Sequence, residues 1–119
     1  MYFGRKSDFF YHYTSKYCAE LILRDMKLYA TNARIKRFGS GVFLTKLAPC
    51  VDEDQLLVNN YIHKSHVYRT KLECAFAIKS SFLVKFKRLK DKCNPERDIW
   101  RFDGDIDLTK CEFHLIHRV

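Results

Sequence analysis

The segment that most restricts the fold of this chain is FFYHYT, at residues 9–14. Aromatic and β-branched residues favour strands, and the segment stops where Thr14 and Ser15 offer an N-cap for a helix. Residues 15–26 then carry apolar side chains at positions i, i+3, i+4 and i+7, the spacing of an amphipathic helix. The sequence therefore predicts a strand followed at once by a helix with one buried face. That face consists of Ala19, Ile22, Leu23 and Met26.

The rest of the chain continues this mixture of strands and helices. An extended piece around Leu28 leads into residues 31–40, a polar and basic stretch without periodicity that we interpret as a loop. A short strand over residues 42–47 and a helix over residues 55–62 follow, and three carboxylates at 52–54 suit the N-terminus of that helix. Further strands are predicted over residues 72–78, 82–87, 99–102 and 113–116. This order favours one α+β domain over residues 1–119, with mainly antiparallel strands.

Composition supports a folded domain and leaves its partner open. Hydrophobic residues make up 47% of the chain, which is more than a disordered chain carries. No apolar run approaches the ~20 residues of a membrane span, and the start of the chain has charges where a signal peptide needs apolar residues. We therefore expect neither membrane insertion nor secretion. The net charge of +8 marks a basic protein that attracts polyanions, so nucleic acid, an acidic protein and a pyrophosphate-bearing cofactor all stay open as partners.

The five cysteines are predicted to be free thiols. They are odd in number, lie 18 to 32 residues apart and form no CxxC pair, which argues against a disulfide framework and a zinc site. Free thiols are typical of a reducing compartment. We therefore expect an intracellular protein, cytoplasmic or nuclear, without a metal, and we expect it to be a monomer.

Two short motifs place polar groups together in extended segments. In FFYHYT, His12 and Thr14 project from one face of the strand, and the two tyrosines project from the other. The segment VFLT follows GSG, and glycine at position 41 lets the backbone come close to a ligand. A core histidine and an ordinary turn are the alternative interpretation of the same residues.

Two longer stretches contain these motifs in order, YHYTSKYCAELILRDMKLYATN and then FGSGVFLTKLAP. Together they resemble the opening half of ADP-ribosyltransferase domains, well over residues 9–49 and loosely over residues 72–116. The closest likeness is to the small toxin-associated transferases named for a His-Tyr-Asp signature, in the branch related to poly(ADP-ribose) polymerases. The resemblance implies an α+β fold with a split antiparallel sheet and two or more short helices. It also implies a cleft whose floor holds His12 and Phe43.

The resemblance assigns roles in NAD binding to single residues. His12 would bind the adenosine-side ribose and Thr14 the nicotinamide-side ribose, while the backbone of Tyr13 would meet the carboxamide. Phe43 would pack beside the nicotinamide. It stands where the family has tyrosine, so a hydroxyl hydrogen bond worth about 0.5 to 1.5 kcal/mol is missing. Gly41, before the second motif strand, belongs to the same expected set.

The third signature residue of the family is acidic, because cleavage of the nicotinamide bond builds positive charge on the ribose. Asp98 comes just before the apolar run IWRF, as the acid does in the polymerase-like relatives, and it is the first candidate. Asp105, in DGDIDL, is the second. Solvated turn aspartates are the alternative for each. Tyr61, on the second predicted helix, is expected near the nicotinamide, with a core position as its alternative.

The resulting prediction is an NAD-dependent mono-ADP-ribosyltransferase that uses NAD as substrate, releases nicotinamide and has NAD glycohydrolysis as a side activity. Its acceptor is a macromolecule, and the sequence does not choose between protein and nucleic acid. Two other classes stay open. One is a catalytically weak or inactive module that binds NAD or ADP-ribose, because Phe43 replaces tyrosine. The other is a small basic nucleic-acid-binding domain, because aromatic strands lie beside lysine clusters.

Overall fold

The computed structural model describes residues 8–31, 40–61, 66–83, 86–89, 91 and 94–118. Two α-helices lie within these residues, α1 (Lys16–Asp25) and α2 (Glu53–Tyr61), with three short 3-10 helices, η1 (His66–Leu72), η2 (Ser80–Phe82) and η3 (Leu108–Lys110). The strands are β1 (Phe9–Thr14), β2 (Lys27–Leu28), β3 (Val42–Leu44), β4 (Cys74–Lys79), β5 (Phe86–Leu89), β6 (Ile99–Phe102), β7 (Ile106–Asp107) and β8 (Phe113–His117).

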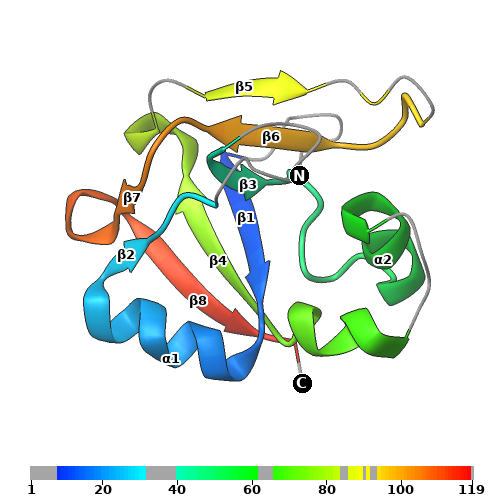
Figure 1. Ribbon diagram of the computed structural model, residues 1–119, viewed down its shortest axis with the longest axis horizontal. Helices are drawn as coiled ribbons and strands as arrows, with labels where there is room; N and C mark the ends of the chain where they lie inside the picture. The colour runs from blue at the N-terminus through cyan, green and yellow to red at the C-terminus, as the bar shows by residue number, and fades with distance from the viewer. Residues whose placement is uncertain are drawn as a thin grey trace, which may run out of the picture.

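Within the described residues, the strands form two three-stranded antiparallel sheets and a short ribbon. The sheets have the orders β1-β4-β8 and β3-β6-β5, and β2 pairs with β7 in the ribbon. Tyr11 and Thr45 exchange backbone hydrogen bonds of 2.8 and 3.0 Å, and this bridge joins β1 to the end of β3. Figure 1 shows β5 and β6 running across the direction of β1 and β4. The α+β fold with antiparallel, split sheets is therefore as predicted.

Helix α1 begins and ends at residues whose capping is visible in the structure. The Ser15 hydroxyl accepts a hydrogen bond of 3.1 Å from the N–H of Cys18, which confirms the predicted N-cap. At the other end Met26 adopts a left-handed conformation with φ of 52°, and the chain turns back into β2. Leu23 was expected on the buried face but is 39% exposed. The core packs against the side of the helix that carries Ile22, and Leu23 lies at the other edge of the apolar face.

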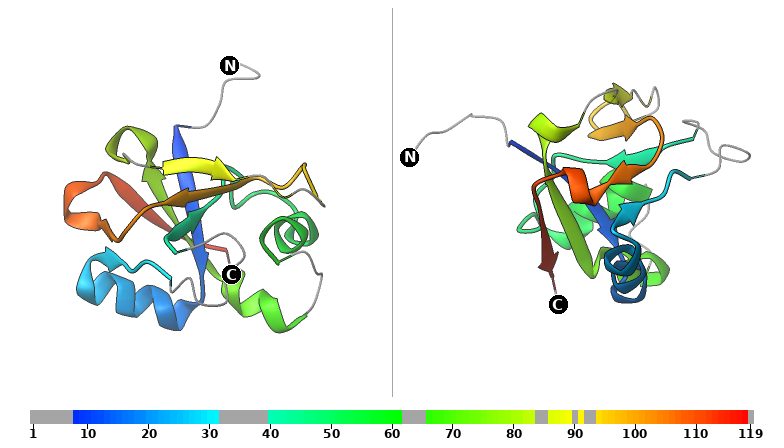
Figure 2. Two further views of the ribbon diagram at one scale, coloured as in Figure 1. Left: turned by 45° about the horizontal axis from the view of Figure 1, so that its top comes forward. Right: turned by 90° about the vertical axis from the view of Figure 1, so that its left-hand side faces the viewer.

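Two clusters of buried side chains cover the two faces of β1 and β4. Phe10 and Phe76 belong to the first cluster, which α1, β2 and β7 help to enclose. Tyr13 and Ala75, which alternate with them along the strands, belong to the second, where Leu57 of α2 packs. Figure 2 shows from two further sides that α1 lies at one end of β1, while β5 and β6 lie at the other. Both motif strands therefore run through the centre of the molecule.

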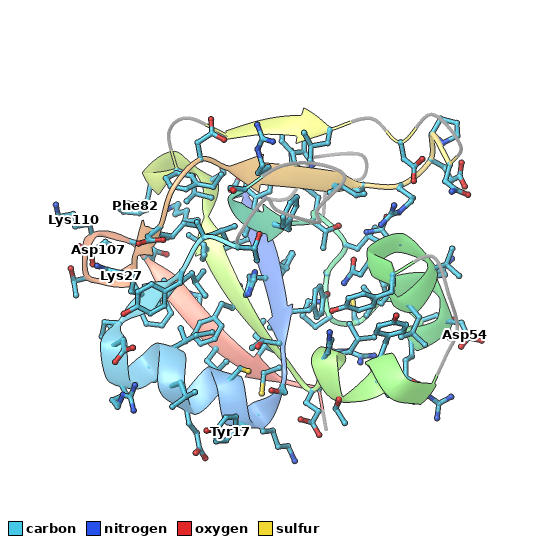
Figure 3. All side chains as sticks on the ribbon, viewed as in Figure 1. Tyr17, Lys27, Asp54, Phe82, Asp107 and Lys110 are labelled. Atoms are coloured by element: carbon cyan, nitrogen blue, oxygen red, sulfur yellow. The ribbon has the colours of Figure 1, made fainter. Side chains whose placement is uncertain are left out.

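The structure corrects part of the predicted strand pattern. Residues 82–87 were expected to form one strand, but Phe82 ends η2 and β5 begins at Phe86. The Ser80 N–H donates to the Asp8 carbonyl at 2.6 Å and turns the chain, which leaves Phe82 45% exposed (Figure 3). Leu72 lies in η1, before β4 begins. Most of the predicted loop at residues 31–40 lies outside the described residues.

The cysteines that the structure describes are free thiols. Cys18 and Cys50 are exposed, Cys74 is buried and Cys111 is half-buried, while Cys93 lies outside the described residues. In the described part of the chain, no three or more His, Cys, Asp and Glu side chains gather in a way that could hold a metal ion. No helix there is long and apolar enough to cross a membrane.

Candidate active site

His12 lies one residue beyond the bridge that joins the two sheets. Its Nδ1 donates a hydrogen bond of 2.9 Å to the carbonyl of Phe43, and this bond requires a proton on Nδ1 because a carbonyl only accepts. Protein surrounds the half-buried ring closely, and this desolvation lowers the pKa of His12, while the bond to Phe43 opposes the shift in smaller measure. The ring is therefore neutral at neutral pH, with Nε2 as a hydrogen-bond acceptor.

The backbone of β1 presents polar groups where β1 and β3 part. In an antiparallel strand, every second residue turns its N–H and C=O to the same side. Because Tyr11 bonds to Thr45 on that side, Tyr13 turns its own N–H and C=O the same way, and so does Phe43 on β3. Among the described residues, the Phe43 carbonyl is taken by His12, and no backbone group pairs with Tyr13 there. Tyr13 thus offers one donor and one acceptor side by side.

The side chains of the two motif strands point in different directions. Thr14 shares a face of β1 with His12 and is 8% exposed. Phe43 alternates with the buried Val42, so its half-buried ring lies on the other face of β3, and His12 contacts Phe43 through the backbone. Tyr13 donates from its hydroxyl to the Leu47 carbonyl at 2.6 Å, and burial raises its pKa. The structure thus joins His12 and Phe43 without placing their two rings together.

Gly41 fixes the start of β3 against its neighbours. A Cβ at this position would lie 2.6 Å from the carbonyl oxygen of Phe102 and 2.6 Å from Cγ of Arg101, and its φ of 153° is one that side chains disfavour. The Gly41 carbonyl also accepts from the N–H and the hydroxyl of Thr31, both at 2.9 Å. Glycine at position 41 therefore allows a close approach to β6 of the same chain.

Asp98 is held in place by its backbone and by one carboxylate oxygen. Its N–H donates to Oδ1 of Asn59 at 2.6 Å, and its carbonyl accepts from Nδ2 of Asn59 at 3.0 Å. Oδ1 of Asp98 accepts from the N–H of Lys46 at 3.3 Å. The side chain is half-buried at the C-terminal end of β3, and Oδ2 has no hydrogen-bond partner among the described residues. The carboxylate is fixed, and one of its oxygens stays available.

Sequence reasoning missed the side chains that support Asp98. Asn59, on α2, is 6% exposed, and its Nδ2 also lies 3.3 Å from the Thr45 hydroxyl. Arg97 donates from Nε to the Asn59 carbonyl at 2.7 Å and from one terminal nitrogen to Asp91 at 2.8 Å. Arg97 and Asp91 are both buried. No motif signals these contacts, because Asn59 is 38 residues from Arg97 and 39 from Asp98 along the chain.

Asp105, the second candidate acid, lies near the opposite end of β3. Its Oδ1 accepts from the N–H of Ala30 at 2.7 Å, and its side chain is exposed. Asp103 and Asp107 are engaged by residues near them, and Figure 3 shows Asp107 at the outer edge of the molecule beside Lys27, its partner across the β2–β7 ribbon. The structure thus separates Asp98 from Asp105.

Tyr61 lies in an aromatic cluster on the face of β1 that carries Tyr13. Its ring stacks on Tyr68 with centroids 4.7 Å apart and planes 7° from parallel, and the Lys71 ammonium lies over both rings. Burial, together with Tyr68, raises the pKa of Tyr61 to about 12. The side chain of His12 projects from the opposite face of β1, so the structure does not bring Tyr61 and His12 together.

The split antiparallel sheet, with HYT on β1 and GSGVFLT leading through β3, is compatible with an ADP-ribosyltransferase-like fold. The sequence model of the family described as "HYD1 signature containing ADP-ribosyltransferase" matches residues 10–110. The chain therefore belongs to this family of ADP-ribosyltransferase domains. The match includes His12, Phe43 and both candidate acids. No curated protein and no solved structure matches the chain.

Proposed function

We propose that this domain transfers a single ADP-ribose group from NAD to a macromolecular acceptor inside cells. The observation that carries the proposal is the state of His12, which is neutral and bonded through Nδ1 to Phe43 in the segment that the family matches. Its Nε2 is then an acceptor for a hydroxyl of the adenosine-side ribose. The N–H and C=O of Tyr13, which pair with no backbone group on this side within the described part of the chain, suit a carboxamide such as that of nicotinamide, which needs one acceptor and one donor.

In the proposed reaction, the bond between C1′ of the ribose and the nicotinamide nitrogen breaks. Its electron pair leaves with nicotinamide, which becomes neutral, and positive charge builds on the ribose. A fixed carboxylate stabilises this charge as it develops. A nucleophilic atom of the acceptor then bonds to C1′ and gives its proton to solvent. Water in place of the acceptor gives free ADP-ribose, which is the proposed slower glycohydrolase reaction.

Asp98 is the stronger candidate for this carboxylate. It is half-buried and held by Asn59 and Lys46, and its Oδ2 has no hydrogen-bond partner in the part of the chain that the structure describes. Asp105 is exposed and held by one backbone N–H. A charge acts more strongly where water is excluded and where it does not have to reorganise during the reaction, and both conditions favour Asp98.

Release of nicotinamide from NAD tests the proposal and the roles together. We expect His12→Ala to weaken NAD binding and turnover alike, because its hydrogen bond is present in the ground state and the transition state. Asp98→Asn should leave KM for NAD nearly unchanged and lower kcat by a factor of about 100 to 1,000. Asp105→Asn is the matched control and should retain activity. Loss of activity in Asp105→Asn alone would transfer the role of the acid to Asp105.

Phe43 defines the second candidate function, a module that binds NAD with little or no chemistry. The ring keeps the shape of the family's tyrosine but lacks its hydroxyl. Saturable NAD binding in calorimetry, with no nicotinamide released by the wild type, would favour this function, and Phe43→Tyr is then the variant that should restore activity. Absence of NAD binding would favour the basic nucleic-acid-binding domain instead.

A further inference from the structure

We infer that Asn59 is a positioning residue for the acid Asp98, an inference that rests on the proposed function. The side-chain amide of Asn59 contacts both backbone polar groups of Asp98, at 2.6 Å to the N–H and 3.0 Å to the carbonyl. It is 6% exposed and projects from α2 toward the start of β6. One side chain therefore sets the position of the residue to which the proposed chemistry is assigned.

The contact resembles the pairing of one more strand residue. An antiparallel partner would exchange N–H···O bonds with the N–H and C=O of the same residue, and the amide of Asn59 makes the same two bonds. Both backbone groups of Asp98 are thereby tied, which limits rotation about its backbone and fixes the direction of its side chain. The carboxylate is then left against the N–H of Lys46 at the end of β3.

Asn59 is itself held by buried groups. The main-chain carbonyl of Asn59 accepts a hydrogen bond of 2.7 Å from Nε of Arg97. Arg97 in turn forms an ion pair of 2.8 Å with Asp91, and both of these side chains are buried. Nδ2 of Asn59 also contacts the buried hydroxyl of Thr45 at 3.3 Å, next to the bridge with β1. The last turn of α2 therefore connects Asp98 rigidly to the junction of the two sheets.

Packing alone does not explain an asparagine at this position. Leu56 and Leu57 of α2 are fully buried and already anchor the helix against the second core cluster. A buried amide must satisfy its donors and its acceptor. Asn59 accepts from the Asp98 N–H, and its amide nitrogen lies within hydrogen-bond distance of the Asp98 carbonyl, the Thr45 hydroxyl and Oδ1 of Asn60. We therefore attribute the asparagine at position 59 to its role in fixing the Asp98 carboxylate.

A double-mutant cycle on nicotinamide release tests the inference. Asn59→Ala should lower kcat about 10- to 100-fold, because a displacement near 1 Å of a catalytic group has an effect of this order, while KM for NAD changes less than about threefold. In Asp98→Asn, the same substitution should lower kcat less than about threefold further, since the carboxylate it positions is already absent. Gln55→Ala is the matched control, because Gln55 is exposed on the same helix and no side-chain contact ties it to Asn59 or Asp98 among the described residues, and its kcat should stay within about threefold of wild type.

Asn59→Asp supplies a second test that keeps the size of the side chain. Its carboxylate still accepts from the Asp98 N–H but cannot donate to the Asp98 carbonyl until it is protonated. We expect the ratio of variant to wild-type kcat to rise as the pH is lowered from about 7.5 to about 5.5, because burial and the nearby Asp98 raise the pKa of such a carboxyl and outweigh the opposing effect of Arg97, which donates to the main-chain carbonyl of residue 59. A merely structural role would leave this ratio flat.

Three results would overturn the inference in distinguishable ways. If Asn59→Ala and Asp98→Asn lower kcat by factors that multiply, Asn59 does not act through Asp98 while the proposed function stands. If Asp98→Asn keeps wild-type turnover, Asp98 is not the acid and the inference fails with that assignment. If the wild type releases no nicotinamide, the proposed function itself fails, and the inference fails with it.

Discussion

The ring of His12 stabilises the folded chain only while it is neutral. Its Nδ1–H satisfies the Phe43 carbonyl where strand pairing between β1 and β3 has ended, and desolvation lowers its pKa from the ordinary value of 6.5. The unfolded chain therefore binds a proton at a higher pH than the folded chain does. This contribution to the free energy of unfolding is complete above about pH 6.5 and is lost as the pH falls toward the lower pKa of the folded state.

We expect His12→Asn to flatten the dependence of stability on pH. Asparagine can still donate to the Phe43 carbonyl, but it does not titrate. Urea unfolding at about pH 7.5 and about pH 5.5 measures the difference, which is at most about 1.4 kcal/mol for each unit by which the pKa of His12 is lowered. His114→Asn is the control for loss of an imidazole from an exposed position of β8. An unchanged pH dependence in His12→Asn would contradict the account of His12.

Gly41 gives a second prediction for a single residue. In Gly41→Ala the backbone keeps a φ that is unfavourable for alanine, and the new Cβ would also overlap the Phe102 carbonyl. Gly104 has a φ of 88° but open space around it. We expect Gly104→Ala to show only the cost of the left-handed backbone, about 1 to 2 kcal/mol. Gly41→Ala should lower the free energy of unfolding by about 1 to 3 kcal/mol more than that. Equal losses in urea unfolding would show that β6 does not require glycine at position 41.

At the scale of elements, local segments were predictable and their contacts were not. Residues 9–14 and 99–102 form strands with the predicted bounds, since aromatic and β-branched runs carry a local signal. The strand predicted to begin at Phe82 was wrong, because a hydrogen bond from the Ser80 N–H to the Asp8 carbonyl, 72 positions away, places Phe82 in a turn. The HYT and GSGVFLT motifs indicated His12 and Phe43. The apolar run IWRF after Asp98 made it the first candidate acid by resemblance, but no local pattern indicated that Asn59 of α2 holds it.

The link between α2 and β6 depends on the buried ion pair of Arg97 and Asp91. In Arg97→Met the Asp91 carboxylate loses a partner 2.8 Å away in a position 1% exposed, and we expect a loss of about 3 to 5 kcal/mol in the free energy of unfolding. Adding Asp91→Leu should recover part of this loss, because it removes the buried negative charge that Arg97 neutralises in the wild type. Arg24→Met, which breaks an exposed pair with Asp25, is the control and should change stability far less.

Urea unfolding of the three variants separates the ion pair from general loss of an arginine. If Arg97→Met were no more harmful than Arg24→Met, the ion pair would not hold α2 to β6. If the double variant were worse than Arg97→Met, the cost would lie in lost packing and lost bonds to the α2 carbonyls, which Arg97 also makes.

For the whole molecule, the two sheets meet at the bridge between Tyr11 and Thr45, and the proposed NAD contacts lie beside that junction. A ligand that binds there contacts both sheets and binds only the folded chain. The net charge of +8 adds a second, less selective attraction for anions of any kind. Ligand-induced stability can distinguish the two effects, because NAD carries few charges and a nucleic acid carries many.

We expect NAD to raise the melting temperature of Asp98→Asn as much as that of the wild type. At a concentration about 100 times Kd, binding adds about 2.7 kcal/mol to the free energy of unfolding, a shift on the order of 10 °C for a chain of this size. Asp98→Asn is the better sample, because it should bind NAD without consuming it. His12→Ala should show a smaller shift at the same NAD concentration, since it loses a binding contact. A short single-stranded RNA serves as the polyanion control. The rise in melting temperature that it causes should fade between about 50 and 200 mM salt, while the rise caused by NAD persists. A rise with RNA and none with NAD, in both the wild type and Asp98→Asn, would favour the nucleic-acid-binding domain over the transferase.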